Sequence, residues 1–156
     1  MSRRYRPVKG ILIGSLLVVS MIAVFLLVRW SLFSPGKQVE EVVEEFYRYE
    51  QAGDFAQSWG LFHSKMKERF SKGHYIQDRS HVFMNHFGVE TFDFEIGKPE
   101  ELKKWNMSKE GPEMKEVYKI PIIQTYKGKY GNFNLHQEIF VIKEKDQWKI
   151  AWDYNQ

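Results

Sequence analysis

The side chains that could do acid–base chemistry lie on two segments in which apolar residues alternate with polar ones. In one segment His136 and Glu138 share a strand face with Phe140, and in another Tyr118 shares a face with Ile120. A buried carboxyl group with a raised pKa, placed beside a hydrogen-bond donor, can transfer protons. Because alternation fixes only which residues share a face, the three side chains converge only if both faces point inward.

In the alternative interpretation, His136 and Glu138 lie on an exposed outer face of their strand. Its core residues are then Leu135, Ile139 and Val141. We favour this alternative, since a half-buried antiparallel strand ordinarily turns its polar residues toward solvent.

Indole side chains form a second group of candidates. Trp59 lies in a helical pattern, and Trp152 ends the last apolar segment. Such residues can line a ligand pocket, although aromatic side chains more often fill a core. Together with Tyr118, His136 and Glu138 they are the candidate pocket residues, and no residue is assigned a catalytic role.

Other common reaction centres and metal sites are absent from the sequence. The chain has no Cys, no glycine-rich phosphate loop, no GxSxG elbow and no SxxK motif. Its five His occur without an HxxxH or HExxH spacing. We therefore expect no metal and no cofactor, while an enzyme built from scattered residues stays open.

The net charge of +3 originates at the amino-terminal end. Five of the 23 basic residues precede residue 30, where no acidic residue occurs: Arg3, Arg4, Arg6, Lys9 and Arg29. The other 18 basic residues accompany all 20 acidic ones, so residues 30–156 carry a charge of −2. This balance gives no electrostatic footprint for nucleic acid, and no nucleic-acid partner is expected.

Residues 10–28 form an apolar run of nineteen residues without a charge. A helix rising about 1.5 Å per residue would span about 28 Å over this run, close to the roughly 30 Å hydrocarbon core of a bilayer. A cleaved signal peptide is the alternative, but bulky residues occupy the positions where cleavage needs small ones. The run therefore predicts an uncleaved transmembrane signal-anchor helix at residues 10–30.

The distribution of Lys and Arg predicts the orientation of this span. Four basic residues precede it, whereas Arg29 and Lys37 are the nearest ones behind it. Residues 1–9 are therefore expected in the cytoplasm as a basic tail, with a single span of the plasma membrane following. A short linker at residues 31–36 would then lead to an extracytoplasmic domain at residues 37–156.

Three segments with a helical period open this domain. Residues 37–52 place valines and aromatic residues on one face and glutamates outside it, and Gly53 and Asp54 separate them from a short helix at residues 55–63. A third helix is expected from residue 71 or 72 to residue 87. Its inward residues would be Ile76, Phe83, Met84 and Phe87.

The period then changes to two, which is typical of strands. The expected strands are residues 89–96, 117–126, 133–143 and 147–153, with hairpin turns at 127–131 and 145–146 and a polar connection at 99–112. Pro121 should mark an edge or a bulge, because it has no N–H to donate. Helices followed by an antiparallel meander predict an α+β fold.

Four short stretches carry a resemblance to a known family: AGDFAQSW at 52–59, FSKGHYI at 70–76, FGV at 87–89 and WKIAWD at 148–153. Residues 37–156 resemble the nuclear transport factor 2-like family, and within it the N-terminal non-catalytic domain of methicillin-resistance type penicillin-binding proteins. The resemblance implies a cone-shaped domain of three helices packed on a curved antiparallel sheet. It does not imply penicillin binding, because the chain stops three residues after Asp153 and leaves no room for a transpeptidase.

These features together predict a membrane-anchored, non-catalytic binding or scaffolding module of the cell envelope. Its expected partner is another envelope protein, and a homodimer through the sheet stays open. One alternative is a small-molecule-binding protein or an enzyme that uses the cone pocket. Another is a regulator of penicillin-binding proteins or a subunit of a secretion or conjugation complex.

Overall fold

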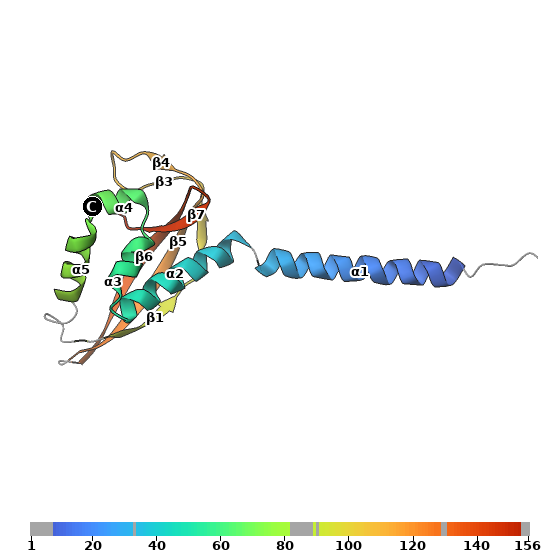
Figure 1. The fold of residues 1–156 in the computed structure, drawn as a ribbon, viewed down its shortest axis with the longest axis horizontal. Helices are drawn as coiled ribbons and strands as arrows, with labels where there is room; N and C mark the ends of the chain where they lie inside the picture. The colour runs from blue at the N-terminus through green and yellow to red at the C-terminus, as the bar shows by residue number, and fades with distance from the viewer. Residues whose placement is uncertain (1–7, 33, 82–88, 90, 129–130, 154–156) are drawn as a thin grey trace, which may run out of the picture. The chain divides into compact units, whose positions relative to one another are not determined.

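The computed structural model shows an α+β protein with an antiparallel sheet and five helices among the described residues (Figure 1). It describes residues 8–32, 34–81, 89, 91–128 and 131–153. The chain divides into two compact units, residues 1–37 and 38–156. The α+β class that the succession of periods predicts is therefore confirmed.

The first unit contains one long apolar helix, α1 (Val8–Leu32). Its segment Leu12–Arg29 is long and apolar enough to cross a membrane, and none of that segment is buried. The hydroxyls of Ser15 and Ser20 donate to helix carbonyls three residues earlier, at 2.9 and 2.8 Å. By length and composition this helix fits a membrane anchor or a signal sequence alike.

Four shorter helices follow: α2 (Pro35–Gln51), α3 (Phe55–Gly60), α4 (Ser64–Arg69) and α5 (Lys72–Ser80). The last three each begin after a side chain that accepts a hydrogen bond from a backbone N–H of the first turn. These capping residues are Asp54, His63 and Ser71.

Two helix boundaries differ from the sequence-based expectation. The helix expected at residues 55–63 ends at Gly60, because the next residues bond to a strand instead: His63 N–H donates to the Ile150 carbonyl, at 2.9 Å. The helix expected to reach residue 87 is described to Ser80. Of its predicted inward residues only Ile76 lies within the described residues, where it packs against the core.

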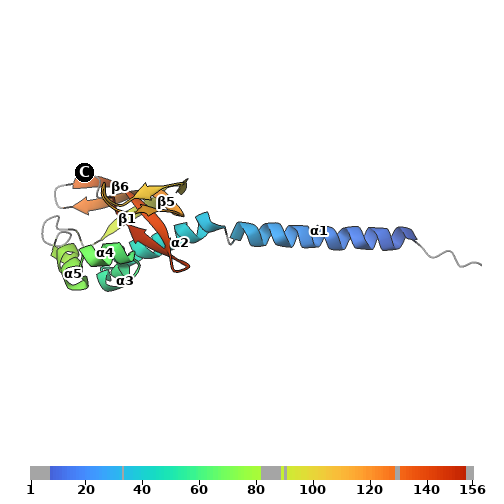
Figure 2. The same ribbon diagram turned by 90° about the horizontal axis from the view of Figure 1, so that it is seen from above.

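The sheet has the order β1-β5-β6-β7, and all neighbours are antiparallel. Its strands are β1 (Phe92–Ile96), β5 (Val117–Gly128), β6 (Gly131–Glu144) and β7 (Gln147–Ala151), and β2 (Glu100–Leu102) pairs with β5 beyond the end of β1. Figure 2 shows α3, α4 and α5 together on one side of this sheet. The four predicted strands are present with ends shifted by a few residues.

The expected polar connection at residues 99–112 is wrong. It contains β2 and the strand β3 (Trp105–Asn106), which pairs with β4 (Glu113–Met114) as a separate two-stranded sheet. Trp105 and Met107 are buried there. The ring of Trp105 stacks on Phe140 of β6 at 4.2 Å, so this segment covers part of the sheet face opposite the helices.

The main core lies between the helices and one face of the sheet. From the helices it contains Val39, Val43, Phe46, Tyr47, Phe55, Met66 and Tyr75. From the sheet it contains Phe92, Ile120, Ile122, Tyr126, Ile139, Val141 and Ile150. Aromatic rings join the two layers, as where Tyr47 of α2 lies 5.5 Å from Phe94 of β1.

Pro121 marks a break in the pairing of β5, as predicted. Its carbonyl accepts a hydrogen bond from Gly97 N–H, at 2.8 Å, just where β1 ends and before β2 begins. The N–H and C=O groups of a strand residue point to the same side of the strand. The N–H that Pro121 lacks would therefore have pointed into this gap between β1 and β2, where no strand needs it. Gly97 is required here, because a Cβ on it would overlap the Pro121 ring.

Both predicted hairpin turns are confirmed by the pairing around them. Gly128 pairs with Gly131, and Glu144 pairs with Gln147. In the second turn both central residues have positive φ, 49° at Lys145 and 62° at Asp146, as a type I′ turn requires.

Candidate functional site

Strand register decides which of the predicted pocket residues can meet. Tyr118 pairs with Val141, whereas Glu138 pairs with Pro121 and His136 with Ile123. Directly opposed residues share a face of the sheet, and successive residues alternate between faces. Tyr118 therefore lies on the face that packs on the helices, while His136 and Glu138 lie on the other face. The structure does not bring these three side chains together.

His136 and Glu138 are both exposed. The Glu138 carboxylate lies 3.3 Å from Lys119 Nζ, with 59% of its side chain accessible to solvent. An ion pair this exposed contributes little free energy and leaves the carboxylate hydrated. This placement agrees with the alternative in which both residues lie on an outer face, and Ile139 and Val141 are indeed buried. Leu135 departs from that alternative, since it is 45% exposed.

Tyr118 is half-buried at the other end of the sheet from the hairpin turn of β5 and β6. Its ring packs edge-on against Trp148, 5.5 Å away. Partial desolvation and the charge of Glu101 raise the pKa of the Tyr118 hydroxyl, so it is protonated at neutral pH. These contacts make Tyr118 a packing residue at the end of the core.

Trp59 and Trp152 are the two predicted candidates that lie near each other, since both contact Phe70. Trp59 Nε1 donates to the Phe70 carbonyl at 2.8 Å, and the Trp152 ring lies 5.9 Å from the Phe70 ring. The Trp152 ring also packs edge-on against Phe62. Trp152 Nε1 is buried and has no hydrogen-bond partner in the described part of the chain.

The buried polar centre of the domain is one that the sequence analysis missed. Glu50 of α2 is 3% exposed, and its carboxylate accepts hydrogen bonds from Ser58 Oγ, Tyr75 OH at 2.7 Å and Arg79 Nε at 2.6 Å. A second nitrogen of Arg79 forms an ion pair with it. These contacts join α2, α3 and α5.

A signal for this centre was present in the helical period of α2. The buried residues Val39, Val43, Phe46 and Tyr47 recur on one face, and Glu50 lies on that same face. A carboxylate in a buried stripe requires a compensating cation. The partner, Arg79, lies 29 residues later, so only the tertiary fold identifies it.

The electrostatics of this centre shift the pKa values of its tyrosines and of Arg79 upward. Burial, together with the charge of Glu50, raises the pKa of Tyr75. Burial likewise raises the pKa values of Tyr47 and Tyr126 nearby. Burial is the largest single influence on Arg79 and alone would lower its pKa, but the charge and hydrogen bond of Glu50 together with the neighbouring tyrosines raise it more, so the net shift is upward. A carboxylate whose oxygens accept from Ser58, Tyr75 and Arg79 is suited to holding helices together.

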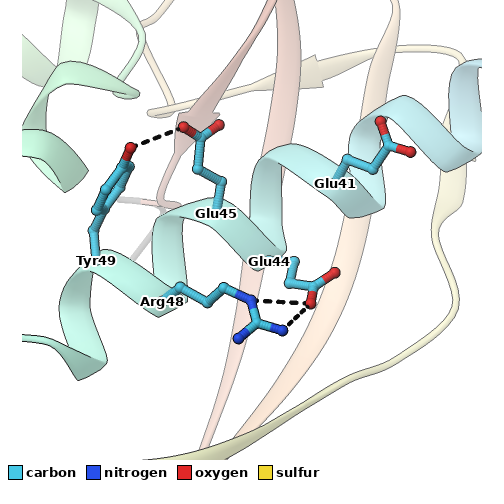
Figure 3. Close-up of a pocket in the computed structure, with 5 residues that line it drawn as sticks. All are labelled: Glu41, Glu44, Glu45, Arg48 and Tyr49. Carbon is cyan, nitrogen blue, oxygen red and sulfur yellow. Dashed lines mark hydrogen bonds and ion pairs between the residues drawn. The ribbon is translucent and has the colours of Figure 1, made fainter.

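A shallow open depression of about 430 Å³ lies along the outer face of α2 (Figure 3). Its lining residues come from this one helix: Glu41, Glu44, Glu45, Arg48 and Tyr49. Arg48 donates to the Glu44 carboxylate at 2.5 and 3.1 Å, and Tyr49 OH donates to Glu45 at 3.1 Å. These are the i,i+4 pairs of a solvated helix face, as the glutamate pattern indicates.

The described residues offer no obvious metal centre. Within them, no group of three or more His, Asp or Glu side chains is placed to hold an ion. The residues that the structure does gather are the Glu50 centre and the aromatic cluster around Trp152.

Comparisons with known proteins give a fold and no family. No family model matches the chain, and no curated protein matches it. Solved structures that match include that of Bd1075 from Bdellovibrio bacteriovorus, with a TM-score of 0.50 and 13% sequence identity. The match covers 74% of this chain and 39% of that chain, so this chain spans well under half of its neighbour's length. At this identity the likeness is one of fold alone.

Proposed function

We propose that the chain is a membrane-anchored, non-catalytic binding or scaffolding module of the cell envelope, with residues 38–156 outside the cytoplasm. The observation that carries this proposal is the exposed apolar surface of α1. Its large apolar side chains from Leu12 to Val28 are 51–70% exposed. A continuous surface of this kind is unfavourable in water and matches the hydrocarbon core of a bilayer.

For the domain we propose the nuclear transport factor 2-like cone, in the form that resembles the N-terminal non-catalytic domain of methicillin-resistance type penicillin-binding proteins. Its support is the succession of helices and then an antiparallel meander, with helices on one side of the sheet. The short stretches at 52–59 and 148–153 carry the resemblance in the sequence.

The proposed absence of catalysis is supported by how the titratable groups are placed. Tyr118 lies on the opposite sheet face from His136 and Glu138, so these groups cannot act on one substrate atom. The buried carboxylate of Glu50 is occupied by Arg79, Tyr75 and Ser58. A general base needs a free lone pair directed at substrate, which this arrangement does not provide.

Single cysteines test the anchor and its orientation, because the natural chain has no Cys. Ser2→Cys reports on the tail, and Lys109→Cys reports on the domain at an exposed loop position. In intact bacterial cells producing the full chain, an impermeant maleimide should label Lys109→Cys and should label Ser2→Cys only after lysis. The reverse pattern would overturn the orientation. Recovery of a shortened, soluble chain would show that α1 is a cleaved signal sequence.

One observation favours a second candidate function, a small-molecule-binding protein. Trp152 Nε1 is a buried donor without a described partner, and it lies among the rings of Phe62, Phe70 and Tyr75. Such a donor could orient a bound molecule. Mass spectrometry of an organic extract of the purified full chain tests this candidate. A compound retained by the natural chain and lost in Trp152→Phe would support it, and an empty extract would count against it.

A further inference from the structure

The half of β6 nearest its turn with β5 has an unpaired edge. Odd-numbered residues of β6 direct their backbone groups toward β5, as shown by Lys143 N–H, which donates to the Glu116 carbonyl. The even-numbered residues therefore face the other side. There β7 pairs with β6 only from Phe140 to Glu144. The N–H and C=O groups of Asn132, Asn134 and His136 consequently point outward with no partner strand among the described residues.

The two outer strands of the same sheet each have contacts on part of their free sides. Beside β7, Ile150 N–H donates to the Leu61 carbonyl and its carbonyl accepts from His63 N–H, both at 2.9 Å. Beside β1, the Gln51 amide donates to the Phe92 carbonyl at 2.7 Å. Natural sheets usually protect an edge with such contacts, with charges, with proline or with a bulge. Residues 131–137 of β6 have no charge and no proline.

Exposed apolar side chains accompany this edge. Phe133 is 37% exposed and Leu135 is 45% exposed. In the described part of the chain, all other large hydrophobic residues with comparable exposure lie in α1. An uncharged strand that offers free backbone groups and apolar side chains is a template for another strand.

We propose that this edge pairs with the same edge of a second copy of the chain, antiparallel and centred on Asn134. In this register Asn134 faces its own counterpart, and Asn132 faces His136 of the other copy. Phe133 then faces Leu135 of the other copy, on both sides of the two-fold axis. The backbone donors and acceptors match, apolar side chains meet apolar ones, and no like charges are opposed.

The sequence around Asn134 favours a second copy over an unrelated strand. Asn-Phe-Asn-Leu-His places a polar residue at the centre, an apolar residue on each side and a polar residue at each end. Such a strand is complementary to itself when it is reversed. The inference rests on the proposed function in one respect: an anchor confines copies to one plane, which raises their effective concentration and lowers the cost of association.

Cysteine crosslinking on the full chain in membranes tests this pairing. Paired residues at the centre lie about 5.5 Å apart, so a short bismaleimide should join two Asn134→Cys chains. Thr125→Cys is the matched control, because Thr125 lies directly opposite Asn134 on β5 and on the same face. In the edge-paired dimer two Thr125 positions are about 14 Å apart, across three strand spacings. We expect dimers from Asn134→Cys at least tenfold more abundant than from Thr125→Cys.

Other outcomes would overturn the proposal. Equal dimer yields at both positions would indicate that two sheets stack face to face. Only monomer at Asn134→Cys, or adducts only with a protein of different mass, would exclude a second copy at this edge. Adding Asn132→Pro removes one outward N–H without affecting pairing with β5 and should lower the yield at least threefold. An unchanged yield, with unchanged thermal unfolding, would also contradict the proposal.

The crosslinking experiment tests the edge pairing and the labelling experiment tests the membrane anchor, so either hypothesis can fail without the other. If Ser2→Cys and Lys109→Cys show no anchor but Asn134→Cys still crosslinks in detergent, the pairing stands and the proposed membrane function fails. If the labelling pattern is as expected and Asn134→Cys stays monomeric, only the pairing fails.

Discussion

The two halves of β6 differ in burial although they belong to one strand and both pair with β5. Residues 139–142 are all buried, with exposed fractions of 0–3%. Residues 131–136 are all exposed. Both halves contain large apolar residues, such as Phe140 in the first and Leu135 in the second. Hydrophobicity along the strand therefore does not decide which half is buried.

The difference in burial is explained by what packs around each half: β7 at the edge, the helices on one face and Trp105 on the other. Beside residues 140–144 lies β7, with its own outer side covered by residues 61–63. The helices cover one face of the buried half, and the ring of Trp105 lies on Phe140 on the other. The exposed half lacks a described strand at its outer edge. We infer that the buried half contributes stability and that the exposed half is available for binding.

The largest effect should come from opening a cavity in the buried half. Phe140→Ala should lower the free energy of unfolding by about 3–5 kcal/mol, because a buried aromatic side chain is lost. Asn134→Ala, its control in the exposed half, should change it by less than about 0.5 kcal/mol. Chemical denaturation of the full chain in detergent measures both. Comparable losses at the two positions would remove the distinction between the halves.

Removing the cover of the buried half should have the next largest effect. Trp105→Ala deletes the ring stacked on Phe140 and should destabilise by about 3 kcal/mol, the lower end for a buried aromatic residue. Lys104→Ala is a control at an exposed neighbour in the same segment. If Trp105→Ala unfolds like the natural chain, the β3–β4 segment does not protect this face.

The boundary between the halves lies where Pro121 pairs with Glu138. Gly97→Ala should destabilise by about 1–3 kcal/mol, because its Cβ would overlap the Pro121 ring and force the strands apart. Gly73→Ala offers a comparison, since nothing lies within 4 Å of a Cβ there. In α5 that change should stabilise by up to about 1 kcal/mol. A neutral Gly97→Ala in thermal unfolding would show that the break is not close-packed.

The smallest expected effect concerns pH at the far end of the buried half. His63 Nε2 lies 3.7 Å from the Glu144 carboxylate, and desolvation lowers the pKa of His63 more than that charge raises it. The unfolded chain then binds the proton more readily, so stability should fall as pH decreases through 6.5, the ordinary His value. For Glu144, burial raises the pKa but the hydrogen bond from Ser64 contributes to a net lowering. A second loss should therefore follow below about 4.5.

His63→Asn separates these two contributions. Asparagine retains an N-cap acceptor for α4 but does not titrate. Thermal unfolding measured from about pH 8 to below 4.5 should then lose its dependence on pH near 6.5, while the loss of stability below about 4.5 remains. The same slope in the variant would assign it to another group.

Local sequence predicted the elements whose signals repeat or whose backbone is constrained. The helical period of residues 37–52 matches α2, and Pro121 and the Lys145–Asp146 turn lie where their backbone chemistry requires. A two-residue strand such as β3 is too short to show an alternating pattern. The sequence therefore predicted neither this strand nor the packing of Trp105 on Phe140. The Glu50–Arg79 pair was missed as well, because a buried ion pair depends on residues that only folding brings together.

By itself, the sequence determined the apolar run of α1, the asymmetry of charge around it and the alternation of the later strands. These are properties of neighbours along the chain, where helix and strand periods act directly. The tertiary structure decided which face Tyr118, His136 and Glu138 occupy, which half of β6 is buried and which carboxylate is saturated. The physical reason is that alternation specifies faces only relative to one another, whereas burial depends on the elements that pack against them.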